Sequence, residues 1–118
     1  TDIYDFLEKK INQCEKNNID RSKIIIDPGI GFGKNLQQNL KIIKDISLFH
    51  SLGTSVLLGS SRKTFIGKMS KNALENERLG GSISSVIYAL NQGVQIFRVH
   101  DVMETKQAID VFNRIKSV

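Results

Sequence analysis

The stretch IIIDPGIGFGKN, residues 24–35, joins an apolar run to a carboxylate and a glycine-rich turn. The isoleucines lack the alternation of polar and apolar residues that marks a half-exposed strand, so they predict a strand covered on both faces. Asp27 ends this strand, and the glycines that follow Pro28 give a backbone that can turn sharply over a ligand. The stretch therefore predicts a buried strand of an α/β fold with a polar group at its carboxyl end.

Two further apolar runs, SVLLG (55–59) and QIFRV (95–99), repeat this pattern after KIIID (23–27). Helical spacing of apolar residues predicts helices at 2–17, 36–52 and 81–93, with Gly93 as a stop. A last helix begins at DVME, where Asp101 is predicted to cap it and Glu104 to reach back as in a capping box. This alternation predicts parallel strands joined by right-handed crossovers.

Three parallel strands do not make a complete domain. A (β/α)8 barrel needs eight strands and about 250 residues, and an open sheet of three strands leaves both edges unpaired. We therefore expect the 118 residues to supply about three βα units of a larger domain.

The composition narrows the class of function. No apolar stretch approaches the ~18 residues that cross a membrane, and no basic-then-apolar leader opens the sequence. Cys14 is the single cysteine, which fits a reducing cytosol. The net charge of +5 is spread along the chain without a basic block or interleaved aromatic residues, so nucleic acid is not expected as a partner. A charged small substrate fits the composition better.

Polar residues end all three predicted strands: Asp27, the segment GSSRKT (59–64), and Arg98 with His100. Ligands of parallel α/β folds bind at this end of the strands. Arg98 and His100 are two residues apart, so on a strand they share one face and could receive an anion together. The alternative is that His100 caps the next helix and Arg98 pairs with Asp101.

The remaining candidates have similar alternatives. Asp27 could bind a heterocycle that presents two parallel N–H groups, or it could cap the loop after it. That loop fits neither a Walker A motif nor a dinucleotide fingerprint; Phe32 is expected at the mouth of a pocket, unless it packs in the core. Lys63 could reach a ring carbonyl and Thr64 could add a hydroxyl, or both could lie in a solvated basic turn.

Four segments taken together, DPGIGFGK, GSSRKTFIG, ERLGGS and RVHDV, resemble the dihydropteroate synthase family of folate biosynthesis in order and spacing. The resemblance implies a TIM-type (β/α)8 barrel in which residues 1–118 form the C-terminal portion of a single pterin-binding domain, the N-terminal strands lying outside this chain. It also implies an enzyme, a transferase that joins dihydropterin-methyl diphosphate to 4-aminobenzoate and releases diphosphate. The isolated chain is expected to be incomplete and inactive.

The resemblance also implies roles for individual residues. The pterin would be bound by Asp27, Lys63 and Arg98, and the diphosphate by Arg98 and His100. The aminobenzoate would contact Phe32, Lys63 and Thr64, where the family commonly has serine in place of Thr64. No residue is implied as an acid or base.

The resemblance also implies a metal cofactor, a cellular location, an oligomeric state and a class of inhibitors. Magnesium would be bound mainly through the N-terminal part, with no metal ligand in this chain. The protein would be a cytoplasmic homodimer that binds small molecules, with no membrane contact, and would be a target of sulfonamides. Two alternatives are a methyltetrahydrofolate-type methyltransferase domain, which needs no diphosphate site, and a non-catalytic domain that binds an anion or a partner protein.

Overall fold

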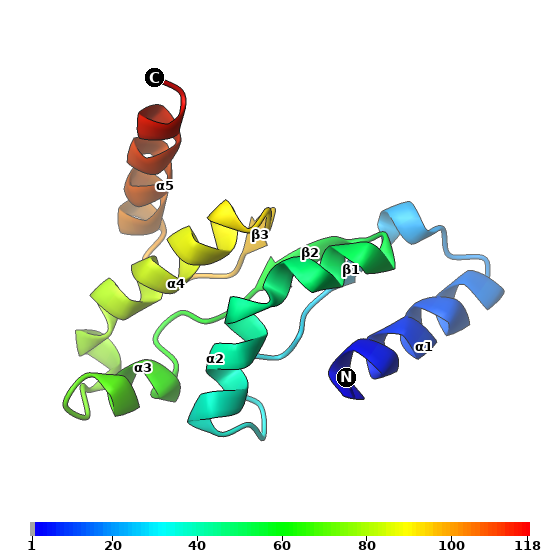
Figure 1. Ribbon diagram of the computed structural model, residues 1–118, viewed down its shortest axis with the longest axis horizontal. Helices are drawn as coiled ribbons and strands as arrows, with labels where there is room; N and C mark the ends of the chain where they lie inside the picture. Colours follow the sequence, from blue (N-terminus) through cyan, green and yellow to red (C-terminus); the bar gives the residue numbers. More distant parts are fainter. Residues whose placement is uncertain (1) are drawn as a thin grey trace.

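A computed structural model describes residues 2–118 as an α/β segment in which helices and short strands alternate (Figure 1). In chain order the elements are α1 (Asp2–Lys16), β1 (Ile25–Ile26), α2 (Leu36–Lys44), β2 (Ser55–Leu58), α3 (Thr64–Met69), α4 (Leu79–Asn91), β3 (Ile96–Phe97) and α5 (Val102–Lys116). Short 3-10 helices occupy Arg21–Lys23, Ile46–Leu52 and Glu75–Glu77.

The three strands form one parallel sheet in the order β1-β2-β3, as the apolar runs predict. Ile25 lies opposite Ser55, and Leu58 lies opposite Phe97. Each strand is shorter than the run that predicted it, and β3 ends at Phe97. The Arg98 N–H still donates to the Leu58 carbonyl at 3.1 Å, so the ladder continues one bond further.

The sheet is covered on one face only within residues 2–118. Ile26 is 4% exposed while its neighbour Ile25 is 54% exposed, and Val56 and Leu58 are buried on the covered side. The predicted cover on both faces is therefore not met at β1 within these residues, while Leu57 and Ile96 on the same face as Ile25 are only partly exposed. Helices supply the covered face, where the core forms; its buried apolar residues include Ile30, Ile42, Ile43, Ile46, Phe49, Phe65, Ile66, Ala89 and Val94.

The predicted helix at 36–52 is also corrected, because it is two elements. α2 ends at Lys44 with Asp45 as its C-cap, and the Leu48 N–H then donates to the Asp45 carbonyl, the three-residue spacing of a 3-10 helix. A 3-10 helix then runs to Leu52, and Gly53 follows with φ +79°. The predicted stop of α4 at Gly93 is present, with φ +96° just beyond the helix.

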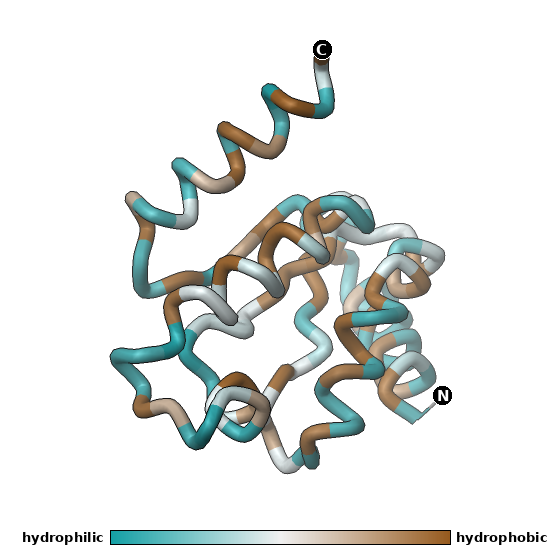
Figure 2. Tube along the Cα trace, turned by 60° about the vertical axis from the view of Figure 1, so that its left-hand side comes forward, coloured by the Kyte–Doolittle hydropathy of each residue, from teal (hydrophilic) through white to brown (hydrophobic). Residues whose placement is uncertain are grey.

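The segment is flat and open. Its radius of gyration is 15.2 Å, whereas a compact domain of this length has about 13.5 Å, and its extents are 45 × 37 × 21 Å. Helix α5 lies at one end of the segment, where it contacts α4 (Figures 1 and 2), and Met103, Val111 and Ile115 on it are exposed. Such a shape is typical of a segment that packs against further structure.

Candidate functional site

The loops at the carboxyl ends of the three strands carry the predicted site residues, and the structure brings these loops together. Asp27 follows β1 directly. Its Oδ1 accepts the Gly29 N–H at 2.9 Å, so one oxygen does cap the loop after the strand. Its Oδ2 lies 3.5 Å from Nη1 of Arg98, which comes from the far edge of the sheet. A carboxylate has about four acceptor positions, so Asp27 retains capacity for a ligand.

Arg98 reaches Asp27 by crossing the end of the central strand β2. The crossing passes over Gly59, where an added Cβ would lie 2.5 Å from Nη2 of Arg98. The glycine is therefore needed for close approach rather than for a turn. Arg98 does not pair with Asp101, contrary to the alternative that the sequence left open.

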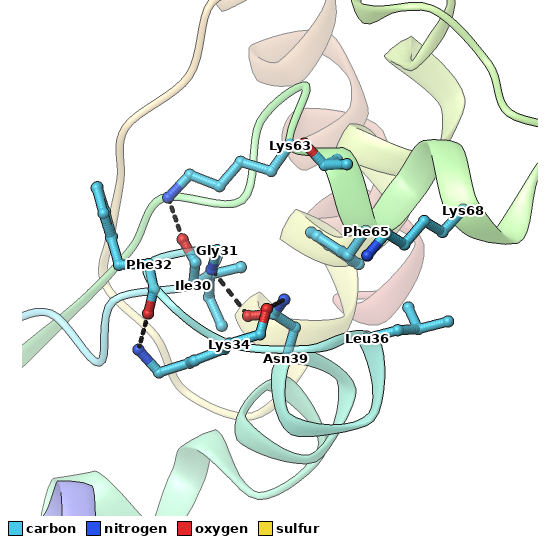
Figure 3. Close-up of a pocket in the computed structure, with 10 residues that line it drawn as sticks. Ile30, Gly31, Phe32, Lys34, Leu36, Asn39, Lys63, Phe65 and Lys68 are labelled. Atoms are coloured by element: carbon cyan, nitrogen blue, oxygen red, sulfur yellow. Dashed lines mark hydrogen bonds between the residues drawn. The ribbon is translucent and has the colours of Figure 1, made fainter.

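Lys63 extends from the loop after β2 into the loop after β1 (Figure 3). Its ammonium donates to the Ile30 carbonyl and lies 4.6 Å from the centroid of the Phe32 ring. Burial lowers the pKa of Lys63 below that of an ordinary lysine, and the positive charge of Arg98 lowers this pKa further. The carboxylate of Asp27 opposes this lowering of the pKa. Lys63 bonds to Ile30, the neighbouring Gly29 bonds to Asp27, and Asp27 pairs with Arg98, so the three side chains gather at one loop.

His100 is held by Ser61, a residue of the loop after β2 whose role sequence reasoning missed. The Ser61 Oγ accepts the backbone N–H of His100 at 3.2 Å and lies 3.0 Å from Nδ1 of the ring. Because the hydroxyl has its own proton to give, it can donate to Nδ1. The neutral ring then carries its proton on Nε2, where it can donate to an anion.

Arg62 and Asp101 form a second link between the same two loops. Nη2 and Nε of Arg62 lie 2.7 and 3.2 Å from the two carboxylate oxygens of Asp101. The pairing lowers the pKa of Asp101 and raises that of Arg62. The predicted capping box at Asp101 is therefore wrong, because the carboxylate makes no cap hydrogen bond to α5. A partner 39 residues earlier in the chain takes it instead.

The segment ERLGGS supports this arrangement from the start of α4. Arg62 has φ +57°, a conformation that costs energy in a residue with a side chain. Its N–H donates to the Ser82 Oγ at 2.8 Å, and its carbonyl accepts from Nη1 of Arg78 at 2.8 Å. These bonds give ERLGGS the structural role that sequence reasoning did not assign.

The three residues predicted for aminobenzoate, Phe32, Lys63 and Thr64, line one cavity of about 190 Å³ (Figure 3). Phe32 is 68% exposed, so it does not pack in the core. Thr64 begins α3, as the predicted helix start requires. Asp27, Arg98 and His100 are not among the residues that line this cavity, but the bonds of Lys63 and the Asp27–Arg98 pair connect the two groups.

Residues 2–118 offer no group of three or more His, Cys, Asp or Glu side chains that could hold a metal ion. They also include no helix with the length and apolarity needed to cross a bilayer.

Comparison with known proteins gives consistent matches. A family model described as "Pterin binding enzyme" matches residues 1–100. The dihydropteroate synthase of Escherichia coli K12 is 42% identical over 106 residues, which are 90% of this chain and 37% of that protein.

Solved structures agree with these matches. The Yersinia pestis dihydropteroate synthase superposes with a TM-score of 0.94 at 37% identity, over 99% of this chain and 48% of that one. The Xanthomonas albilineans dihydropteroate synthase, solved with 7,8-dihydropteroate, gives 0.96 at 34% identity, over 99% and 45%; it has also been solved with 4-aminobenzoic acid. The chain thus spans less than half the length of each of these relatives.

Proposed function

Because the chain belongs to the pterin-binding enzyme family, whose model matches residues 1–100, we propose that it is the C-terminal portion of a dihydropteroate synthase. The reaction is the condensation of dihydropterin-methyl diphosphate with 4-aminobenzoate to dihydropteroate and diphosphate. Residues 1–118 would supply the last three strands of one (β/α)8 barrel domain. The open sheet supports this reading, because its exposed face, which carries Ile25, would become the interior of the closed barrel.

The observation that carries the proposal is the meeting of Asp27, Lys63 and Arg98, from three different strand ends, at the loop of Gly29 and Ile30. We assign the pterin amino and ring N–H groups to the Asp27 carboxylate. Lys63 contacts the pterin carbonyl and ring nitrogen, and Arg98 lies over the ring. A ring with two parallel donors on one edge suits a carboxylate that otherwise meets only one backbone N–H and one arginine.

The diphosphate is assigned to Arg98 and to Nε2–H of His100. In the reaction the bond between the methylene carbon and the diphosphate oxygen breaks, and the aniline nitrogen forms a bond to that carbon. The nitrogen then loses a proton to solvent or to the released diphosphate. Cationic and N–H donors stabilise the charge that develops on the leaving group. No side chain of this segment is assigned as an acid or base.

The aminobenzoate is assigned to the cavity lined by Phe32, Lys63 and Thr64. The site mainly positions the amine behind the methylene carbon. With both substrates bound and oriented, the bimolecular reaction becomes an effectively unimolecular step. The X. albilineans relative has been solved with 4-aminobenzoic acid, which supports this ligand class. Sulfonamides, as mimics of the aminobenzoate, are proposed to compete for the same cavity.

Magnesium is proposed, from the resemblance to the family, as a cofactor held mainly by the N-terminal part of the domain; residues 2–118 contain no cluster of three or more metal-ligating side chains. A cytoplasmic homodimer is also proposed. The exposed apolar residues of α5, including Met103 and Val111, support a buried role for that helix in the complete protein.

The test uses the complete barrel, meaning the full-length protein in which this segment is joined to the rest of the domain. Incubation with the pterin diphosphate and 4-aminobenzoate should give dihydropteroate and diphosphate in equal amounts, and added diphosphate should inhibit. No product would refute the proposal, and methyl transfer from methyltetrahydrofolate without diphosphate inhibition would favour the methyltransferase alternative. The purified 118-residue chain should form no product, since it supplies only part of the barrel.

A further inference from the structure

A buried amide on α2, Asn39, is bonded to the glycine-rich loop of the site. The residue is 3% exposed. Its Oδ1 accepts the Gly31 N–H at 2.8 Å, and its Nδ2 lies 3.5 Å from the Lys34 carbonyl (Figure 3). Burial of an amide is unfavourable unless its polar atoms are bonded, and both bonds found here go to residues 29–34.

This loop has little intrinsic rigidity. Gly29, Gly31 and Gly33 have φ values of +76°, +90° and +63°, and glycines lose the most conformational freedom when they are fixed. The loop contributes its own restraint through Lys34, whose ammonium donates to the carbonyls of Gly29 and Phe32 at 2.7 and 3.1 Å. Asn39 adds the restraint from the helix layer beneath.

The restraint matters for the cavity because two of its walls depend on Gly31. A Cβ added at Gly31 would lie 3.0 Å from Cδ of Lys63, so the lysine chain runs directly over this glycine. Phe32 comes next in the chain, and its ring is exposed rather than packed. The position of the ring is therefore set by the backbone of the loop and by the contact with Lys63.

We propose that Asn39 is a positioning residue for the aminobenzoate: by binding the Gly31 N–H it fixes the loop so that Phe32 forms one wall of the cavity beside Lys63. The inference rests on the proposed function. It predicts a larger effect on aminobenzoate than on the pterin, because Phe32 is assigned to aminobenzoate alone, while Asp27 lies at the end of β1 and Lys63 belongs to the loop after β2.

The experiment compares two variants of similar shape in the complete barrel. Asn39→Leu removes the acceptor, and the KM for 4-aminobenzoate should rise about 2- to 12-fold, as expected when one hydrogen bond that holds the loop is lost. The pterin Kd, measured by calorimetric titration, should stay within about twofold of wild type. Asn39→Asp keeps an oxygen for the Gly31 N–H but sets its other oxygen against the Lys34 carbonyl in a buried position, so it should recover part of the loss and remain closer to wild type than Asn39→Leu. The control Gln37→Leu makes the same chemical change at an exposed position of α2 and should leave both constants unchanged.

The outcomes separate the inference from the proposed function. Wild type that binds no pterin and forms no product contradicts the function itself. Active wild type with an unchanged aminobenzoate KM in Asn39→Leu overturns the role of Asn39. An equal loss of pterin and aminobenzoate binding also overturns it, because that pattern indicates general structural damage. If Asn39→Leu does not fold, Asn39→Ala decides, because it also removes the acceptor without adding a larger apolar group, and the same selective rise in KM is required.

Discussion

Replacing Asp27 by asparagine tests the pterin site at one atom. The Gly29 N–H can keep its bond to the remaining oxygen of the amide, whereas the other oxygen, now an NH2 group, can no longer accept from the pterin. One charge-assisted hydrogen bond is lost, which is worth about 1.5 to 3 kcal/mol. The Asp27–Arg98 pair is long and partly exposed, so its own loss should add less than about 1 kcal/mol.

The Kd of the complete barrel for a pterin should therefore rise about 10- to 150-fold, since ~1.4 kcal/mol corresponds to a factor of ten. Isothermal titration calorimetry measures this directly. Asp20→Asn is the matched control, because Asp20 caps the 3-10 helix that precedes β1 through a bond to the Ser22 N–H and lies outside the site. A Kd that is unchanged in Asp27→Asn, or raised equally in Asp20→Asn, would refute the assignment of Asp27.

Three further predictions concern the support of the site. A Cβ at Gly81 would overlap Cγ2 of Ile66, whereas one at Gly80 would meet nothing within 4 Å. In urea titrations of the complete barrel, Gly81→Ala should lower the free energy of unfolding by about 1 to 3 kcal/mol, and Gly80→Ala should not lower it. Equal effects of the two substitutions would show that the contact with Ile66 is not the cause. The link between Arg62 and Asp101 can be removed from either side, by Arg62→Met, by Asp101→Asn or by both together. All three proteins should show a similar fall in kcat/KM, because each lacks the same link between loops. A fall in the double variant equal to the sum of the two single effects would show that the side chains act separately. Burial lowers the pKa of Lys63, so between that pKa and 10.5 the folded state binds fewer protons than the unfolded chain. The free energy of unfolding of wild type, measured relative to Lys63→Met, should therefore rise with pH in this window. A difference between the two proteins that does not change with pH would show that the pKa is not lowered.

The parallel sheet could be predicted because short, continuous apolar runs between helical patterns leave few other arrangements. Which segments of the protein cover the two faces of the strands could not be predicted. The sequence of β1 is that of a strand buried on both faces, but Ile25 is still 54% exposed within residues 2–118. A run of apolar residues indicates that a strand is buried on both faces, but it does not indicate which segment packs against each face.

The strand-end residues were predictable for a similar reason. Asp27, Lys63, Arg98 and His100 each follow an apolar run, and parallel strands bring such positions to one edge. The residues that hold them were missed because their partners are distant in sequence. The sequence around Asp101 predicts a helix cap, but in the folded protein its carboxylate pairs with Arg62. Asn39 did give a signal, since it is a polar residue within the apolar stripe of α2, between Leu36 and Ile43.

A crystal structure of the complete barrel with a non-reactive analogue of the pterin diphosphate would show directly which side chains bind the substrate. The ring should place its amino and ring N–H groups on the Asp27 carboxylate, with the Lys63 ammonium at its carbonyl. The phosphates should lie between Arg98 and His100. A ring bound away from Asp27, or phosphates held by other residues while Arg98 and His100 face solvent, would contradict these assignments.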